Sequence, residues 1–220
     1  MKGERIPVRV LSAQLIANAS AGLCRALKLK KAYRSIGLLS ADSDDALYIA
    51  LDEATKAANV EVVYGKSLYA GAANASTKLA GEVIGILGGQ NPSEVKSGLQ
   101  AAVSALSDIG FRKANDEGDV VYLAHCVSRT GSFLAKTANV PVGQAIAYLI
   151  APPVEAIVGV DAALKASDVE LTQFFAPPSE TNFGGALLTG TQSACRAACE
   201  AFAAAVCAVA DEPMGGNDGI

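Results

Sequence analysis

The sequence predicts an α/β protein of the α+β kind, built as a tandem duplication of one domain. Strand-like and helical patterns alternate along the chain, and a segment of the first half recurs in the second. Ala54–Val62 reads ATKAANVEV and Ala163–Leu171 reads ALKASDVEL, so five residues recur in place at an offset of 109. An offset near half of 220 residues indicates two similar domains, since solenoid repeats are only about 20 to 50 residues long. We expect domains at residues 1–110 and 111–220.

The composition is that of a compact and unusually apolar protein. Hydrophobic residues make up 51% of the chain and charged residues 18%, which excludes a disordered protein. The net charge is −4, and the only basic cluster is the short stretch Arg25–Arg34, so we expect neither nucleic acid nor a membrane as partner. The start, MKGERIPVRV, has no apolar core, and we expect no export signal. The low charge fraction favours burial of some surface against other subunits.

Both halves predict the same order of elements: strand, short helix, strand, longer helix, strand, loop, strand and closing helix. In the first half the expected ranges up to the final strand are Val8–Ala17, Ala21–Leu29, Ser35–Ser40, Asp44–Ala58, Val60–Tyr64 and Glu82–Leu87. In the second half they are Val120–Val127, Gly131–Ala138, Ala145–Ala151, Val154–Ser167, Val169–Phe175 and Ala186–Leu188.

The two closing helices differ in character. Asn91, Pro92 and Glu94 give the first one an N-cap, a first-turn proline and a capping-box partner, ahead of apolar residues at helical spacing. The second, Ala194–Ala210, is apolar nearly all round. We therefore expect it to be buried, at a domain or subunit contact.

No set of residues predicts catalysis, a metal site or a bound cofactor. The single histidine, His125, lacks the signals of a catalytic pair with Cys126, because adjacent strand residues point to opposite faces. Cys195 and Cys199 lie one helical turn apart, but no further ligands accompany them, so we expect small core residues. The glycines from Gly184 to Gly190 lack the Lys and Ser/Thr order of a phosphate-binding loop.

Three acids occur in only one of the two copies. Asp44 and Asp45 start the long helix of the first half, where the second half has Pro153 and Val154. Glu82 starts the last strand of the first half, where the second half has the uncharged stretch 182–186. Acids at a helix start also favour the helix dipole, but the repeat shows that the fold does not require them. Neighbouring carboxylates that repel each other favour a small cation between them. A glycosidase pair is disfavoured, since the chain has no Trp to form a sugar platform.

Longer motifs carry a specific resemblance. They include SIGLLSADSDDALYIALDEATKAANVEVVYGKSLYAGA, KLAGEVIGILGG, VSRTGSFLAKTA, AYLIAPPVEA and PPSETNFGGALLTGTQSACRAACEAF. The sequence resembles the L-type shell proteins of the ethanolamine-utilisation bacterial microcompartment, from about Ser12 to Ala210. The resemblance implies two circularly permuted shell domains, a homotrimer that mimics a hexamer, and tiling with other shell proteins into a shell in the cytoplasm. It also implies a central pore gated by loops, and no catalytic activity.

The resemblance further implies a bound ethanolamine. By matching motif, the residues that bind it are Asp44, Asp45 and Glu82, and the pocket is completed by Phe111, Thr181, Asn182 and Phe183. The loop Ser67–Gly81 is long and rich in small residues, and we expect it to move and to place Tyr69 and Gly71 near the threefold axis. The alternative is a small-amine-binding regulatory trimer outside any compartment.

Overall fold

A computed structural model of the chain describes residues 1–68, 82–179 and 182–215, and it divides into two compact units. One unit consists of Pro7–Gly110 and Gly131–Leu134, and the other of Met1–Ile6, Phe111–Thr130 and Ala135–Ile220. From the sequence, Met1–Ile6 is expected with the first half and Gly131–Leu134 with the second. By their contacts, each of these two short segments instead packs with the opposite half.

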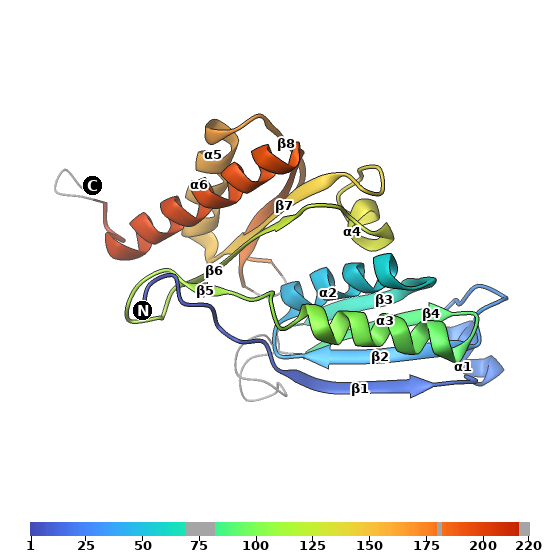
Figure 1. The fold of residues 1–220 in the computed structure, drawn as a ribbon. Coiled ribbons are helices and arrows are strands. Elements are labelled where there is room, and N and C mark those ends of the chain that lie inside the picture. Colours follow the sequence, from blue (N-terminus) through green and yellow to red (C-terminus); the bar gives the residue numbers. More distant parts are fainter. Residues whose placement is uncertain (69–81, 180–181, 216–220) are drawn as a thin grey trace. The chain divides into compact units, whose positions relative to one another are not determined.

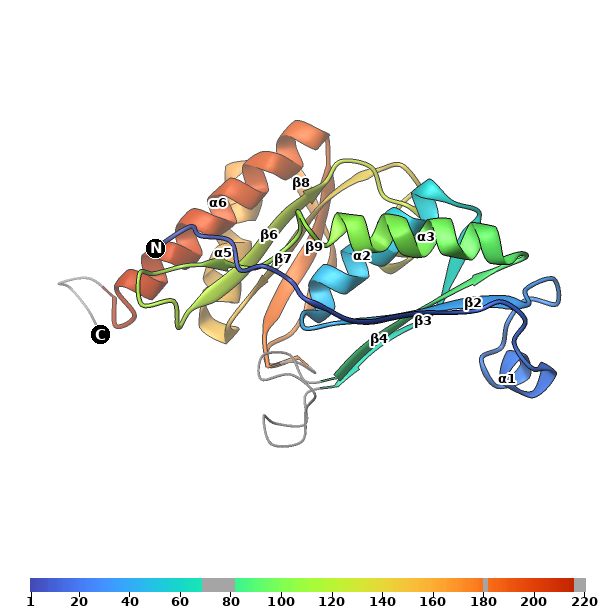
Figure 2. The ribbon, with the colours of Figure 1, turned by 60° about the horizontal axis from the view of Figure 1, so that its bottom comes forward.

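The first unit is an antiparallel sheet covered on one face by two helices. Its strands are β1 (Val10–Ile16), β2 (Ser35–Ala41), β3 (Val60–Leu68) and β4 (Glu82–Gly89), and its helices are α1 (Ala21–Ala26), α2 (Asp44–Ala57) and α3 (Pro92–Ala105). The strand order is β1-β2-β4-β3. Figures 1 and 2 both show α2 and α3 on the same face of this sheet, with α1 beyond the end where β1 leads into β2. Leu47 and Leu51 of α2 and Leu87 of β4 are fully buried in the layer between them.

The second unit repeats this plan. Its elements are β5 (Arg112–Lys113), β6 (Val121–Val127), β7 (Ala145–Ala151), α5 (Pro153–Ala166), β8 (Val169–Phe175), β9 (Gly184–Gly190) and α6 (Gln192–Asp211). The short helix α4 (Ser132–Thr137) begins within the segment that packs with the first unit and ends in the second unit. The strand order is β5-β6-β7-β9-β8, so β6-β7-β9-β8 matches the order of the first unit. The tandem duplication of one α/β domain is therefore confirmed. Even the register irregularity recurs, between Val62 and Tyr64 in one copy and between Leu171 and Gln173 in the other.

The burial expected for the last helix is only partly correct. Six of the twenty residues of α6 are buried, and they lie on one face: Cys195, Ala198, Cys199, Phe202, Val206 and Cys207. This face packs on β6 and β7 and against α5. Among the residues described, α6 is the one helix whose length and composition would allow it to cross a membrane. Because its buried face belongs to the core of the second unit, we regard it as a core helix with one face left open in the single chain.

Candidate functional site

The acids Asp44 and Asp45 lie in the first turn of α2, and both are almost inaccessible to water. Their exposed fractions are 5% and 7%. Carboxylates in the first turn interact favourably with the partial positive charge of a helix N-terminus. Carboxylates removed from water are stabilised by hydrogen bonds or by a nearby positive charge. Two consecutive buried acids at a helix start are therefore a candidate position for a small cation.

Ser43 adds an unsatisfied hydroxyl beside these acids. It is the N-cap residue of α2, with an extended backbone, but its side chain makes no capping hydrogen bond. Its Oγ is buried and has no hydrogen-bond partner within the described part of the chain. By contrast, Ser20, Asn91 and Thr191 accept hydrogen bonds from backbone N–H groups at the starts of α1, α3 and α6. Sequence reasoning missed Ser43, because a serine before a helix ordinarily predicts a cap.

The second unit supplies an internal comparison for this position. Both α2 and α5 are 14 residues long, and α5 begins with Pro153 and Val154 where α2 begins with Asp44 and Asp45. The sequence alignment of the two helix starts is therefore confirmed. Val154 is 63% exposed, so the same place in the second copy is an open apolar surface. The fold accepts either arrangement, and the buried acids are a property of the first copy.

The other expected ligands of the first half are described only in part. Glu82 begins β4, and its backbone pairs with Leu68 of β3. The Glu82 side chain lies outside what the structure describes. Tyr69 and Gly71, the residues expected at the pore, also lie outside the described residues, as does Thr181.

Phe111 and Phe183 are brought together within the second unit. Their ring centroids are 5.7 Å apart with an interplanar angle of 42°, a tilted aromatic contact. Asn182 is exposed and has a positive φ of 68°, and its N–H donates to the carbonyl oxygen of Ser179 at 3.0 Å. The Ser179 N–H in turn donates to the carbonyl oxygen of Phe183 at 2.7 Å. This turn fixes the backbone that carries Phe183 next to Phe111.

The cysteines of α6 are core residues, as expected. Cys195 and Cys199 are buried in the hydrophobic cluster of the second unit. Burial raises the pKa of the Cys195 thiol to about 11, and it also raises the pKa of Cys199. Both thiols are therefore held in the protonated form near neutral pH. Within residues 1–68, 82–179 and 182–215, no three His, Cys, Asp or Glu side chains form a group that could hold a metal ion.

Comparison with known proteins agrees with the fold. Residues 35–115 match the BMC domain family. The chain is 59% identical over 216 residues to the microcompartment shell protein EutL of Clostridium perfringens, covering 98% of this chain and all of the relative. It is 54% identical to EutL of Escherichia coli K12, covering 93% of this chain and 94% of the relative. The crystal structure of EutL from Leptotrichia buccalis superposes with a TM-score of 0.93 at 59% identity, covering 98% of this chain and all of that one. With this identity over nearly its whole length, the chain belongs to the EutL family of bacterial microcompartment shell proteins, and it is a structural protein of a compartment shell in the bacterial cytoplasm.

Proposed function

We propose that this shell protein forms a homotrimer with a gated central pore, and that it binds ethanolamine without transforming it. The two similar units support the trimer, since three chains then present six related domains around one axis, and closed cyclic symmetry is the usual form of a homo-oligomer. The relatives are structural shell proteins, which supports a role without catalysis. Flat near-sixfold trimers of this kind can tile with other shell proteins.

The ethanolamine site rests mainly on the buried acids of α2. An ammonium group is a compact cation with three hydrogen-bond donors, and it suits the carboxylates of Asp44, Asp45 and Glu82. Phe111 and Phe183 would offer aromatic faces, which attract cations more weakly, and Thr181 and Asn182 would complete the pocket. Ser43 adds a buried hydroxyl with no described partner, which suits the hydroxyl of ethanolamine. The observation that carries the proposal is that these buried polar groups occur in one copy only.

The affinity should be modest. Ethanolamine has four non-hydrogen atoms, and even about 1.5 kcal/mol for each would give about 6 kcal/mol, or a Kd of tens of micromolar. Calorimetry on the wild type, Asp45→Asn and Glu82→Gln tests the site. Each variant removes a charge-assisted hydrogen bond, so we expect the Kd to rise about tenfold or more.

The matched control for these variants is Glu155→Gln. Glu155 is the first-turn acid of α5, the equivalent helix of the second copy. The Glu155→Gln substitution therefore removes one negative charge from the same kind of position. Its affinity for ethanolamine should equal that of the wild type. Equal affinities in all four proteins would refute the site, and consumption of ethanolamine by the wild type would refute the non-enzymatic role.

The gated pore needs its own experiment. We propose that Ser67–Gly81, with Tyr69 and Gly71, borders the threefold axis and adopts two arrangements. The corresponding segment of the second copy, Pro177–Gly184, differs from it in length and composition. Crystals of the trimer grown in several forms would show whether the loop changes. A loop held in one arrangement at the outer rim in every form would contradict the gate.

A further inference from the structure

The segment around α1 carries a concentration of positive charge that the rest of the chain lacks. Residues 25–34 contain five cations and no acid: Arg25, Lys28, Lys30, Lys31 and Arg34. The other 210 residues hold 13 of the 18 Lys and Arg and all 22 Asp and Glu, which gives them a formal charge of −9. A basic patch in a chain that is acidic elsewhere indicates attraction of an anionic ligand to this place.

The duplication shows that this charge is not needed for the fold. The equivalent segment of the second copy, Ser132–Gln144, runs from the start of α4 to the residue before β7. Its only charged residue is Lys136, in the last turn of α4. The same elements therefore form with one cation in place of five. The four additional cations are a property of the first copy, as are the buried acids of α2.

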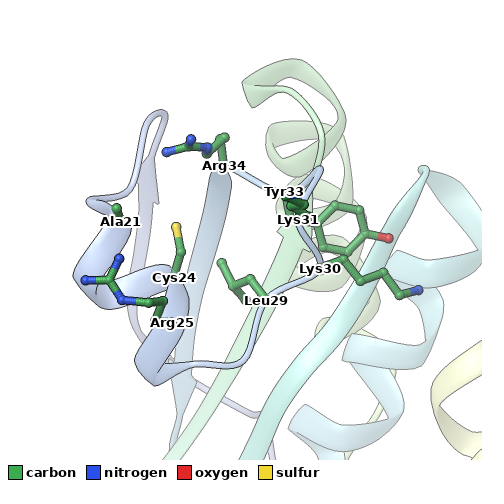
Figure 3. Close-up of a pocket in the computed structure, with 8 residues that line it drawn as sticks. All are labelled: Ala21, Cys24, Arg25, Leu29, Lys30, Lys31, Tyr33 and Arg34. Carbon is green, nitrogen blue, oxygen red and sulfur yellow. The ribbon is translucent and has the colours of Figure 1, made fainter.

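Several of these cations line a concave site. A cavity of about 330 Å³ lies between α1 and the segment that leads into β2 (Figure 3). Arg25, Lys30, Lys31 and Arg34 line it together with the partly buried Tyr33 and Leu29. In Figure 3 the side chains of Arg25 and Arg34 extend to the same side, with the Cys24 thiol between them, whereas Lys30 extends the opposite way.

The charges around the cavity differ in how far they are already compensated. The Lys30 ammonium lies 2.6 Å from a carboxylate oxygen of Glu61 on β3, and 5.6 Å from the centre of the Tyr33 ring. The Glu61 carboxylate, which faces the Lys30 ammonium, raises the pKa of Lys30, so this cation is charged and already has an anionic partner. Within the described part of the chain, no acid lies within ion-pair distance of Arg25, Lys31 or Arg34. Three cations are thus available to a ligand.

We propose that this cavity binds the phosphate group of a small anion, with Arg25 and Arg34 as its principal ligands. Guanidinium groups present planar pairs of N–H donors that match the oxygens of a phosphate, and Lys31 adds a point charge. A phosphate group fills only part of about 330 Å³, and a cavity of this size takes a small metabolite. The apolar wall of Leu29 and Tyr33 suits the organic part of a phosphate ester. This site involves none of the residues proposed for ethanolamine, so a negative result for one site leaves the proposal for the other unaffected.

Binding of orthophosphate and of AMP to the full-length protein tests the site. AMP serves as a phosphate monoester large enough to use the rest of the cavity. Titrations followed by ³¹P NMR at about 0.15 M salt, where the screening length is about 8 Å, suppress long-range attraction. We expect the Kd for both probes to rise at least tenfold in Arg34→Gln and in Arg25→Gln. Both side chains are exposed, and circular dichroism checks that each variant keeps the fold.

Lys28→Gln is the matched control. Lys28 belongs to the same basic stretch but does not line the cavity, so this variant lowers the local charge equally. Its affinities should stay within twofold of the wild type. Tighter binding of AMP than of orthophosphate assigns the site to a phosphorylated metabolite, and equal binding assigns it to the phosphate group alone; both support the proposal.

Three results would overturn it. These are no binding of either probe at 10 mM, an equal loss in Lys28→Gln and Arg34→Gln, and binding that survives both arginine substitutions. An acidic peptide of glutamates is added as a competitor. If this peptide binds through Arg34 while neither phosphate probe does, the patch is a docking surface for an acidic protein segment, and the phosphate site is wrong.

Discussion

Asp52 joins two segments that are far apart in the sequence. It is fully buried on α2, and its two carboxylate oxygens accept hydrogen bonds from the N–H groups of Gly131 at 2.6 Å and Leu134 at 2.8 Å. Its counterpart in the second copy, Asp161, is exposed and pairs with Lys165 at 2.6 Å. The aspartates at equivalent positions therefore have different roles. Asp161 forms an ion pair at the surface, whereas the buried Asp52 holds Gly131–Leu134 in place.

The titration of Asp52 gives a pH-dependent prediction. Burial is the largest influence and raises the pKa of Asp52, and the nearby Glu53 carboxylate acts in the same direction. The N–H groups of Leu134 and Gly131 and the Lys56 ammonium at 3.9 Å lower this pKa, but by less. An acid whose pKa is raised on folding stabilises the fold most below its unfolded pKa, near 3.8, and this contribution is lost as the pH rises through the folded pKa. The unfolding free energy of the wild type minus that of Asp52→Asn should therefore be larger at pH 4 than at pH 7.

Urea unfolding at both pH values measures this difference, with Asp161→Asn as the control that removes one exposed acid. For Asp161→Asn, the difference in unfolding free energy from the wild type should not become smaller between pH 4 and pH 7. A difference for Asp52→Asn that widens toward pH 7 would mean that the two backbone hydrogen bonds outweigh burial, which would contradict the prediction.

Ser43 provides a second test on a single side chain. Its buried Oγ has no described partner, and an unsatisfied buried hydroxyl costs about 1–3 kcal/mol. Ser43→Ala should therefore leave the unfolding free energy of the ligand-free protein unchanged or slightly higher. Thr191→Ala is the contrast, because Thr191 caps α6 by accepting from the Ala194 N–H at 3.2 Å, and losing a cap costs about 1 kcal/mol. Equal destabilisation in thermal unfolding would show that Ser43 is an ordinary cap.

Among the helices, local capping residues predict where a helix starts, but they do not reveal hydrogen-bond partners that are distant in the sequence. Asn91 caps α3 as expected, since its Oδ1 accepts from the Glu94 N–H at 3.0 Å. A capping box also expects the Glu94 carboxylate to accept from the backbone N–H of Asn91. This part of the prediction is wrong, because the carboxylate accepts instead from the Asn59 N–H at 2.7 Å. Asn59 lies 35 residues away, at the turn before β3, so no local pattern could reveal this partner. The open face of α6 was missed for a similar reason, since an all-round apolar sequence does not say which residues a neighbour covers.

The start of α4 depends on a close approach to α2. A Cβ at Gly131 would lie 2.2 Å from Thr55 Oγ1 and 2.7 Å from the carbonyl oxygen of Asp52, which is too close for any side chain. Gly131→Ala should therefore push this segment away from α2, break both hydrogen bonds to Asp52 and lower the unfolding free energy by about 2 kcal/mol or more.

Gly22→Ala is the matched control for this substitution. A Cβ at Gly22, within α1, would meet no atom within 4 Å, and alanine favours a helix over glycine by about 1 kcal/mol. Its unfolding free energy should stay level or rise. The importance of the close approach would be disproved if both alanine variants unfolded at the urea concentration of the wild type.

Across the two units, the duplication could be predicted because Ala54–Val62 recurs as Ala163–Leu171 and both halves keep the same order of elements. The shared register irregularity became visible only in the structure. The packing of Met1–Ile6 within the second unit could not be predicted from the sequence. The Gly3 N–H donates to the Lys113 carbonyl oxygen at 2.8 Å, and Lys113 pairs with Glu4 at 2.7 Å. These contacts join residues more than a hundred positions apart and lie outside the repeat, so neither periodicity nor internal comparison could indicate them. For the site, the repeat identified Asp44 and Asp45, whereas Ser43 needed the observed burial.

Apolar surface that the single chain leaves open favours assembly into the proposed trimer. The single chain exposes large apolar side chains on neighbouring elements of the second unit, including Ile157 and Val158 of α5 and Leu171 and Phe174 of β8. With only 18% charged residues, the chain offers few ion pairs to hold subunits together, so apolar burial should supply the association. Light scattering should give about three times 22.3 kDa at 0.15 M and at 1 M salt alike, since salt at 1 M shortens the screening length to about 3 Å and weakens only charged contacts. A stable monomer at micromolar concentration would disprove the trimer, and dissociation confined to 1 M salt would show that charged contacts hold it.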